Sequence, residues 1–231
     1  MTLILLAYNE ETKVVQSIKN YLQQLSDTIG NYELIVVNDG SVDNTAALIQ
    51  PFNQSITIIN NNKNLGFAVS LKKAITNSKY DKFFWMGADN PDRNLIPYIN
   101  SYKSSKTSIS YLTVTDYKNR YVSRAFLSKS YTAIVNFLFR LNVPYYNGRI
   151  ILSQKNFDIR KICNSRFALA QMIILQLRKN KFNISSIEEN ISINDKDVSS
   201  ESIPRLISTT LVDLLIFRLK TIFSYKSYLN E

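Results

Sequence analysis

Apolar residues follow two alternating patterns along the first ninety residues of the chain. Short, mostly apolar runs of strand length occupy residues 3–7, 33–37, 56–59 and 82–86. Segments whose apolar residues recur at helical spacing lie between these runs, at residues 11–25, 45–50 and 67–76. Strands that are apolar throughout and alternate with helices are typical of a parallel sheet buried on both faces. The pattern predicts an α/β fold with a mostly parallel sheet flanked by helices.

The pattern is less regular after residue 92. We expect further helices at residues 95–102, 128–141, 167–179 and 203–225, and one further strand at residues 108–115. A length of 231 residues favours a single domain, which we place at residues 1–200. Residues 201–231 are expected to form a C-terminal amphipathic helical extension. Two interpretations of that helix stay open, a core helix and an interfacial helix that touches anionic lipid.

Polar or turn-forming residues follow each of the four early strands. The four segments span residues 7–11, 38–41, 61–66 and 87–90. The carboxyl ends of parallel strands meet at one edge of a sheet, which is where ligands of such folds bind. We therefore expect the carboxylates of these segments to converge on one binding site.

Charge and composition narrow the chemistry of that site. Lys and Arg outnumber Asp and Glu by 28 to 18, which gives a net charge of +10 and favours an anionic partner. The aromatic and basic residues form no nucleic-acid-binding motif, so nucleic acid is not expected as a partner. The chain has no histidine, which excludes Ser-His and Cys-His nucleophiles and removes the usual zinc ligand. Acid-base chemistry must fall to carboxylates, Tyr or Lys.

The single cysteine and the first residues of the chain bear on the cellular compartment. The single cysteine, Cys163, excludes an internal disulfide and is compatible with a reducing compartment. The first apolar run is short and soon meets Asn9 and Glu10, unlike a signal peptide or a membrane span. We expect a cytoplasmic protein that is peripheral at the inner face of a membrane.

Four segments of the chain, taken in order, resemble the family 2 glycosyltransferases of the GT-A fold. They are LLAYNEE at residues 5–11, ELIVVNDGSVDNT at 33–45, NKNLGFAVSLKKAI at 62–75 and FFWMGADN at 83–90. The branch they resemble most is that of the dolichyl- or polyprenyl-phosphate sugar synthases. A weaker match runs through Arg124, Ser128, Asn136 and residues 146–149. The resemblance implies an inverting glycosyltransferase that uses a nucleotide-sugar donor.

The resemblance also implies roles for particular residues at the expected edge. Ala7, Tyr8 and Glu10 correspond to the nucleotide-binding loop, Asp39 to the carboxylate that contacts the base or ribose, and Gly66 to the point where the backbone approaches the nucleotide. Asp89 corresponds to the last Asp of the family's Asp-x-Asp motif, and so to the catalytic carboxylate that holds Mg²⁺ or Mn²⁺ on the diphosphate.

Two positions depart from the family pattern and bear on metal and acceptor. Gly87 stands where the motif has its first Asp, which removes one carboxylate near the metal. Asn147 stands in an acceptor loop where the family has Asp, and a neutral amide cannot act as a base. A phosphate acceptor is already anionic and can attack without a base, whereas a hydroxyl benefits from one. We therefore expect polyprenyl phosphate as acceptor, with Arg124 and Arg149 as catalytic residues that bind its phosphate.

Two alternatives remain open on the sequence alone. The first is transfer to a saccharide hydroxyl during surface-polysaccharide assembly at the cell envelope, with Asp116, Glu188 or Glu189 as the base. The second, suggested by Gly87 and Asn147, is a non-catalytic protein that binds nucleotide sugars.

Overall fold

A computed structural model of the chain describes residues 1–104, 108–114, 122–146, 150–165, 167–179, 183–189, 203–224 and 228. The chain divides into two compact units. Unit 1 contains residues 1–106 and 149–155, and unit 2 contains residues 107–148 and 156–231. Each unit is described by itself below. The domain boundary expected near residue 200 stays a prediction.

Unit 1 is built on a five-stranded sheet. Its strands, in the order β3-β2-β1-β4-β6, are β3 (Thr57–Asn60), β2 (Glu33–Asn38), β1 (Thr2–Ala7), β4 (Lys82–Gly87) and β6 (Leu152–Ser153). The first four are parallel, and β6 pairs antiparallel with β4. The predicted mostly parallel sheet is therefore confirmed, while the short β6 was not expected.

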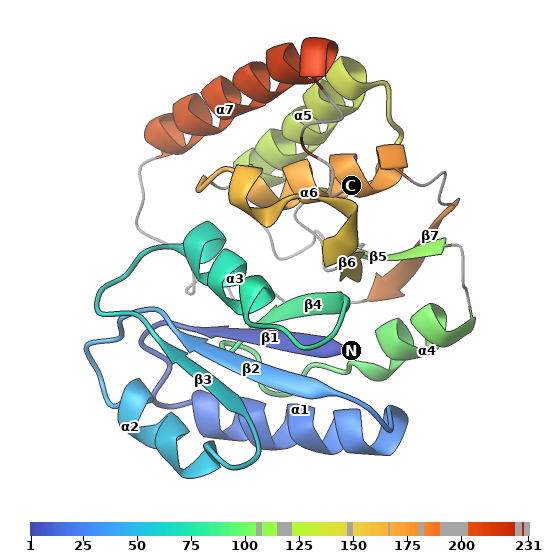
Figure 1. The fold of residues 1–231 in the computed structure, drawn as a ribbon. Coiled ribbons are helices and arrows are strands. Elements are labelled where there is room, and N and C mark those ends of the chain that lie inside the picture. The colour runs from blue at the N-terminus through green and yellow to red at the C-terminus, as the bar shows by residue number, and fades with distance from the viewer. Residues whose placement is uncertain are drawn as a thin grey trace. The chain divides into compact units, whose positions relative to one another are not determined.

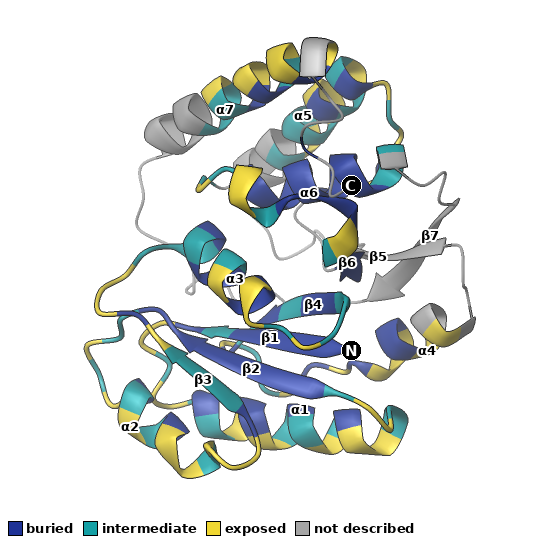
Figure 2. Ribbon diagram, in the orientation of Figure 1, coloured by how far each residue is buried: buried dark blue, intermediate teal, exposed yellow. Residues whose placement is uncertain are grey.

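Burial explains why the two central strands are mostly apolar. Every residue of β2 is buried, and only Leu6 of β1 is less than fully enclosed. Helix α3 (Phe67–Thr76) covers one face of the sheet, and α1 (Val14–Thr28) and α2 (Thr45–Ile49) cover the other (Figure 1). A strand enclosed on both faces gains no stability from polar alternation, so its sequence is a continuous apolar run. Figure 2 shows the buried sheet between partly exposed helices.

The remaining helical segments of unit 1 are short. A 3₁₀ turn (Gln50–Phe52) extends α2, and α4 (Ile96–Ser104) follows the segment after β4. Helix α3 begins and ends at the predicted residues. Helix α1 begins three residues later than expected, because Lys13 and Val14 first donate backbone hydrogen bonds to the Glu10 carbonyl in the turn before it.

Unit 2 combines helices with a two-stranded parallel sheet. Its helices are α5 (Val122–Phe139), α6 (Ala168–Lys179) and α7 (Ile203–Ser224), and its strands are β5 (Ser108–Val114) and β7 (Asn183–Glu189). Helix α5 begins six residues before the predicted start. It ends at Phe139 because Arg140 adopts a left-handed conformation with φ 52°.

Aromatic rings form the core between α5, α6 and α7. Phe217 of α7 is almost fully buried, and its ring centroid lies 5.5 Å from that of Phe139, 5.6 Å from that of Phe167 and 5.2 Å from that of Tyr228. The guanidinium of Arg178 lies 5.4 Å from the centre of the Phe139 ring. These contacts fix the side of α7 that faces the core of unit 2.

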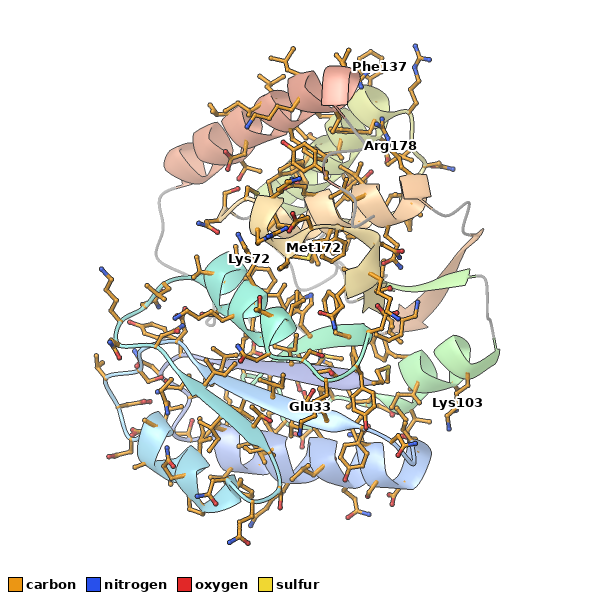
Figure 3. All side chains as sticks on the ribbon, viewed as in Figure 1. Glu33, Lys72, Lys103, Phe137, Met172 and Arg178 are labelled. Atoms are coloured by element: carbon orange, nitrogen blue, oxygen red, sulfur yellow. The ribbon has the colours of Figure 1, made fainter. Side chains whose placement is uncertain are left out.

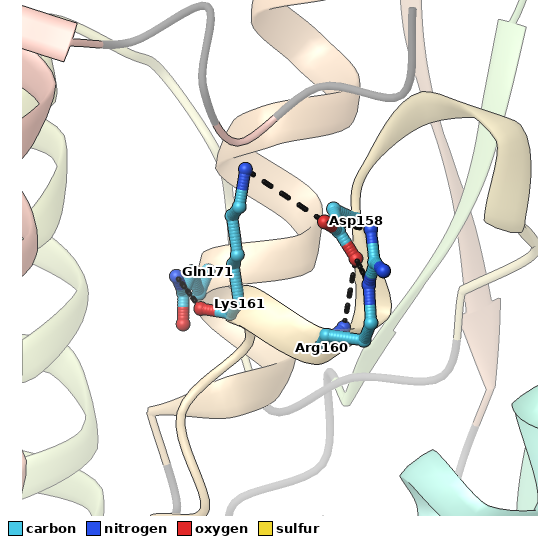
Figure 4. Close-up of polar contacts among 4 residues, drawn as sticks. All are labelled: Asp158, Arg160, Lys161 and Gln171. Carbon is cyan, nitrogen blue, oxygen red and sulfur yellow. Dashed lines mark hydrogen bonds and ion pairs between the residues drawn. The ribbon is translucent and has the colours of Figure 1, made fainter.

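A buried carboxylate organises the turn before α6. Asp158 caps the 3₁₀ turn Ile159–Lys161, accepts hydrogen bonds from the Arg160 backbone and guanidinium, and pairs with Lys161 at 3.7 Å (Figure 4). The Arg160 hydrogen bond lowers the pKa of Asp158 to about 2. Gln171 of α6 donates to the Lys161 carbonyl, which ties the turn to the helix.

Candidate functional site

The carboxyl ends of the four parallel strands of unit 1 lie side by side, and their hydrogen bonding continues into the segments that follow. The Asp39 amide donates to the Ala7 carbonyl at 2.8 Å, and the Ala88 amide donates to the Leu6 carbonyl at 2.9 Å. The Asn61 amide donates to the Asn38 carbonyl at 2.9 Å. The segments after β3, β2, β1 and β4 therefore form one row, which we call the carboxyl edge. It contains Ala7, Tyr8, Glu10, Asp39, Gly66 and Asp89, whose roles in binding stay predictions.

Asp39 is the most heavily bonded carboxylate of the carboxyl edge. Its side chain is buried, and Oδ1 accepts hydrogen bonds from the Asn61 side-chain amide at 2.8 Å and the Leu65 backbone amide at 2.9 Å. Oδ2 accepts one from the Gly66 backbone amide at 2.9 Å. A carboxylate has about four acceptor positions, so one position on Oδ2 is left. Asp39 thus holds the segment after β3 against the end of β2.

A cation supports this carboxylate indirectly. Asn61 is buried and donates its second side-chain hydrogen to Ser70 Oγ at 2.8 Å. Lys73 Nζ donates to Asn61 Oδ1 at 2.6 Å, which polarises the amide that donates to Asp39. Asn61, Ser70 and Lys73 lie in segments that the sequence singled out, but sequence reasoning gave them no role of their own. The available signal was the three-residue spacing of Ser70 and Lys73, which puts both side chains on one face of α3.

Gly40 allows the segment after β3 to approach so closely. Its φ is +69°, and a Cβ at this position would lie 2.1 Å from the Lys63 carbonyl carbon and 2.6 Å from the Asn64 nitrogen. Both contacts are with backbone atoms, which cannot rotate away as a side chain can. Glycine at position 40 is therefore required by conformation and by space.

Glycine at position 66 is favoured by its backbone conformation and lies next to open space. It caps α3 with φ +84° and ψ 162°, a conformation open almost only to glycine. Among the described residues other than its two chain neighbours, no atom lies within 4 Å of the position that its Cβ would occupy. The backbone at Gly66 therefore borders open space, where a ligand can approach it directly.

Reciprocal hydrogen bonds fix the segment after β1 to the one after β2. The Asn9 amide donates to Ser41 Oγ at 3.0 Å, and the Val42 amide donates to Asn9 Oδ1 at 3.0 Å. Asn9 takes a left-handed φ of 55°, which asparagine tolerates better than most residues. Tyr8, the residue before Asn9, is 44% exposed, so its ring is available to a ligand.

A second set of bonds joins the same two segments around Asp43. Its carboxylate accepts from the Glu11 amide at 3.1 Å and the Thr45 amide at 3.0 Å, and Thr45 Oγ1 accepts from the Glu10 amide at 2.8 Å. Desolvation raises the pKa of Asp43, but the hydrogen bonds from Thr45 and Glu11 outweigh it, and the net pKa is lowered. The bond from the Thr45 amide satisfies a backbone donor at the first residue of α2, whose N-cap is Asn44. Glu10 contributes through its backbone, while its side chain is half-buried.

Asp89 differs from Asp39 in being exposed. No hydrogen bond or ion pair joins it to another residue in the part of the chain that the structure describes. Its carboxylate lies against Gly87, where a Cβ would be 2.4 Å from Asp89 Oδ1. The Asp89 carboxylate thus occupies the space that a side chain at position 87 would need.

Helix α1 holds the backbone on both sides of Asp89. Ser17 Oγ donates to the Ala88 carbonyl at 2.8 Å, and the Tyr21 hydroxyl donates to the Asn90 carbonyl at 2.7 Å. Gln24 donates to the Arg93 carbonyl at 2.9 Å and accepts from the Leu95 amide at 2.6 Å. Sequence reasoning treated Tyr21 only as one of the apolar positions of this helix, and it missed Ser17 and Gln24. Their spacing of three or four residues is the signal that places them on one face.

The metal expected from the resemblance can be tested against these side chains. Within the described residues, no group of three or more acidic, cysteine or histidine side chains could enclose a metal ion. Mg²⁺ commonly binds through one or two carboxylates, with substrate phosphates and water as its other ligands. A single unpaired carboxylate at Asp89 fits a metal ion whose other ligands are substrate phosphates and water.

Several predicted residues cannot be compared with this edge. Asp116, Asn147 and Arg149 lie outside the described residues. Arg124 lies on α5 and Glu188 and Glu189 lie on β7, where only the backbone is described. Their predicted roles stay predictions.

Asn136 of the weaker match has a structural role inside unit 2. Its side-chain amide donates to the Val143 carbonyl at 2.9 Å, and its Oδ1 accepts from the Val143 amide at 3.0 Å and from the Tyr146 hydroxyl at 2.9 Å. Burial raises the pKa of Tyr146, so this phenol stays a hydrogen-bond donor at neutral pH. Asn136 thereby fixes the segment that leads to residue 147.

Comparison with protein families gives a match over most of the chain. The model of the family described as Glycosyl transferase family 2 matches residues 2–157. An uncharacterized glycosyltransferase of Haemophilus influenzae is 39% identical over 74 residues, and a poly-beta-1,6-N-acetyl-D-glucosamine synthase of Staphylococcus aureus is 32% identical over 91 residues. The two matches cover 31% and 38% of this chain. They cover 22% and 21% of those proteins, so the chain spans about a fifth of their length.

Solved structures confirm the predicted fold. Glucosyl-3-phosphoglycerate synthase from Mycobacterium tuberculosis in complex with uridine diphosphate is similar with a TM-score of 0.64 at 12% identity, over 94% of this chain and 79% of that chain. The same synthase with Mg²⁺ and uridine diphosphate gives a TM-score of 0.64 at 13% identity, over 94% and 78%. At these identities the likeness supports the fold alone, and the fold is the predicted α/β arrangement of GT-A type.

The close approach at Gly40 generates the first prediction. Gly40→Ala should lower the free energy of unfolding of unit 1 by about 2 kcal/mol or more, because the methyl group meets the Lys63 backbone at a strained φ. Gly30→Ala is the matched control, since nothing lies within 4 Å of that Cβ position. Denaturant unfolding followed by Trp85 fluorescence measures both, and equal stability of the two variants would contradict the packing described.

The hydrogen bonds from α1 to the segment after β4 generate the second prediction. Tyr21→Phe keeps the buried ring but removes the donor to the Asn90 carbonyl, so the backbone amides of residues 88–95 should exchange hydrogen about five- to tenfold faster. Tyr32→Phe is the control, because the Tyr32 hydroxyl has no hydrogen-bond partner in the described chain. Unchanged exchange at residues 88–95 in Tyr21→Phe would mean that α1 does not position this segment.

Proposed function

Since the chain belongs to glycosyl transferase family 2, we propose that it transfers a sugar from a nucleoside diphosphate sugar to polyprenyl phosphate at the cytoplasmic face of a membrane. The observation that carries the donor half of this proposal is the carboxyl edge. It combines a buried, preorganised carboxylate, an exposed aromatic ring, a glycine bordering open space and an unpaired carboxylate within one row of loops.

Three residues are proposed to hold the nucleotide. Asp39 has one acceptor position left on Oδ2, which can receive a hydrogen bond from the base or ribose. Tyr8 offers an exposed ring that can cover a flat base. At Gly66 the absence of a side chain lets the backbone approach the nucleotide. Ala7 and Glu10 contribute through the backbone bonds that keep the first two loops in register.

Asp89 is proposed to bind Mg²⁺ or Mn²⁺ together with the diphosphate. When bound, such a metal stabilises the negative charge that develops on the leaving diphosphate. The mycobacterial synthase has been crystallised with uridine diphosphate and either metal, which supports the same pairing here. Gly87 leaves room for the Asp89 carboxylate, and the bonds from Ser17 and Tyr21 of α1 hold its backbone in place.

The proposed reaction is a single displacement that inverts the anomeric carbon. An oxygen of the acceptor phosphate forms a bond to the anomeric carbon while the bond between that carbon and the diphosphate oxygen breaks. The nucleoside diphosphate leaves with the electron pair. An anionic phosphate needs no base for this attack, which agrees with the neutral Asn147. Arg124 and Arg149 are proposed to bind the acceptor phosphate. The resemblance to the polyprenyl-phosphate branch and the net charge of +10 support this acceptor.

Transfer to a saccharide hydroxyl is the second candidate. It is favoured by the identity of 32% over 91 residues with a poly-beta-1,6-N-acetyl-D-glucosamine synthase. That reaction needs a base, for which Asp116, Glu188 and Glu189 are the proposed residues.

A panel experiment separates these functions. The protein is incubated with nucleotide sugars and Mg²⁺ or Mn²⁺, and nucleoside diphosphate release is followed with no acceptor, with polyprenyl phosphate and with free saccharides. We expect polyprenyl phosphate to stimulate release, and Asp89→Asn to reduce it at least about a hundredfold by losing the metal carboxylate. Asp27→Asn, an exposed acid on α1, is the charge-matched control and should retain activity.

The remaining outcomes of this panel are equally informative. If only a free saccharide stimulates nucleoside diphosphate release, the acceptor is a saccharide hydroxyl and the proposal of a lipid phosphate acceptor is wrong. No release with any donor, together with measurable nucleotide binding, would identify a non-catalytic binding protein.

A further inference from the structure

Helix α7 has apolar residues on two opposite sides. Leu214, Phe217 and Thr221 are buried on the side that packs in unit 2. The other side carries five aliphatic residues that are 44–60% exposed, namely Val212, Leu215, Ile216, Leu219 and Ile222. At 3.6 residues per turn these five fall on one strip centred on Leu219. Burial within unit 2 therefore accounts for only one side of this helix in its described part.

The neighbouring helix adds to the exposed apolar surface. Phe137 of α5 is 83% exposed, and Ile134, one turn before it, is 41% exposed. Helices α5 and α7 pack together through Phe139 and Phe217, and Phe137 lies near the C-terminal end of α7 (Figure 3). We call these seven residues the α5–α7 apolar face. Apolar side chains that are exposed singly are normal, whereas a group of them on neighbouring helices is typical of an interaction surface.

Basic side chains border the apolar strip of α7. Arg218 and Lys220 stand one residue before and one residue after Leu219, about 100° to either side of the centre of the strip. Lys220 is exposed, and Arg218 is half-buried with its guanidinium 5.7 Å from the centre of the Phe139 ring. Asp213 lies on the Lys220 flank, and Arg140 is exposed at the end of α5. Among the described residues of α7, the flanks of the strip thus carry two cations and one anion.

We propose that the α5–α7 apolar face docks on an anionic phospholipid bilayer. An apolar strip with cations on both flanks lets aliphatic side chains enter the headgroup boundary while the cations reach the lipid phosphates. The net charge of +10 attracts such a surface but repels a second copy of the chain. Within the described residues no helix is long and apolar enough to cross a membrane. The inference deepens the proposed function, because it places the enzyme at the membrane that contains its polyprenyl phosphate.

Vesicle binding of the full chain tests this inference without any substrate. We expect co-sedimentation with vesicles of phosphatidylglycerol and phosphatidylcholine at low salt, and weaker binding to phosphatidylcholine alone or at high salt. The double variant Leu215→Gln/Leu219→Gln should reduce vesicle binding at least about tenfold, since it removes two inserting side chains. Ile96→Gln, an exposed aliphatic residue of α4 in unit 1, should bind as the wild type does.

Charge and insertion are tested separately. Lys220→Glu should weaken binding to the anionic vesicles more than Lys19→Glu, the same charge change at an exposed position of α1. Leu219→Trp adds a second tryptophan to the single Trp85. Its fluorescence should shift to the blue, and brominated lipid should quench it, when anionic vesicles are added.

The outcomes that overturn the inference are distinct from failure of the proposed function. Equal vesicle binding by wild type and Leu215→Gln/Leu219→Gln, or no spectral shift in Leu219→Trp, would exclude membrane docking by this face. A concentration-dependent dimer that the double variant abolishes, with no vesicle binding by the wild type, would assign the face to a second copy. Nucleoside diphosphate release without vesicles should be the same in the double variant and the wild type, so it tests the donor reaction independently.

Discussion

The buried Asp39 carboxylate fixes the loop before α3 against the end of β2. Its bonds to the Leu65 and Gly66 amides satisfy backbone donors at the start of α3, where helical partners are lacking. A buried carboxylate without such donors would cost several kcal/mol, so the loop and the charge stabilise one another. Asn61 and Lys73 extend this arrangement into α3, and Gly40 provides the space that it needs.

The other half of the carboxyl edge is organised differently. The backbone around Asp89 is held by polar side chains of α1, while the Asp89 carboxylate itself is exposed and unpaired among the described residues. A rigid backbone beneath a free carboxylate suits a group that must coordinate an incoming ion. Asp39, held by three hydrogen bonds with one acceptor position left, suits a group that must present one fixed acceptor. The two acids therefore have environments that match the different roles proposed for them.

The fold of unit 1 was predictable because its strands are buried on both faces and so appear as uninterrupted apolar runs. The residues of the carboxyl edge were predictable as well, since they follow those runs directly. The partners of Asp39 and the polar residues of α1 were not, because bonds from side chains to distant backbone depend on the packed structure. Strand β7 was missed because only Ile184 and Ile187 among its residues are apolar. The sequence left open whether α7 is a core helix or an interfacial helix, because apolar residues on two faces of a helix are compatible with both.

The central claim is that Asp39 assembles the donor site by holding residues 65 and 66. Asp39→Asn replaces one acceptor oxygen by an amide group that cannot accept the bonds it received. Calorimetric titration of uridine and guanosine diphosphates with Mg²⁺, alongside hydrogen exchange of the Leu65 and Gly66 amides, tests this directly. We predict faster exchange at both amides and an affinity lower by at least about tenfold for the diphosphate that wild type binds, with Asp158→Asn as a buried-carboxylate control that leaves both unchanged. Faster exchange at both amides with unaltered nucleotide affinity would contradict the account.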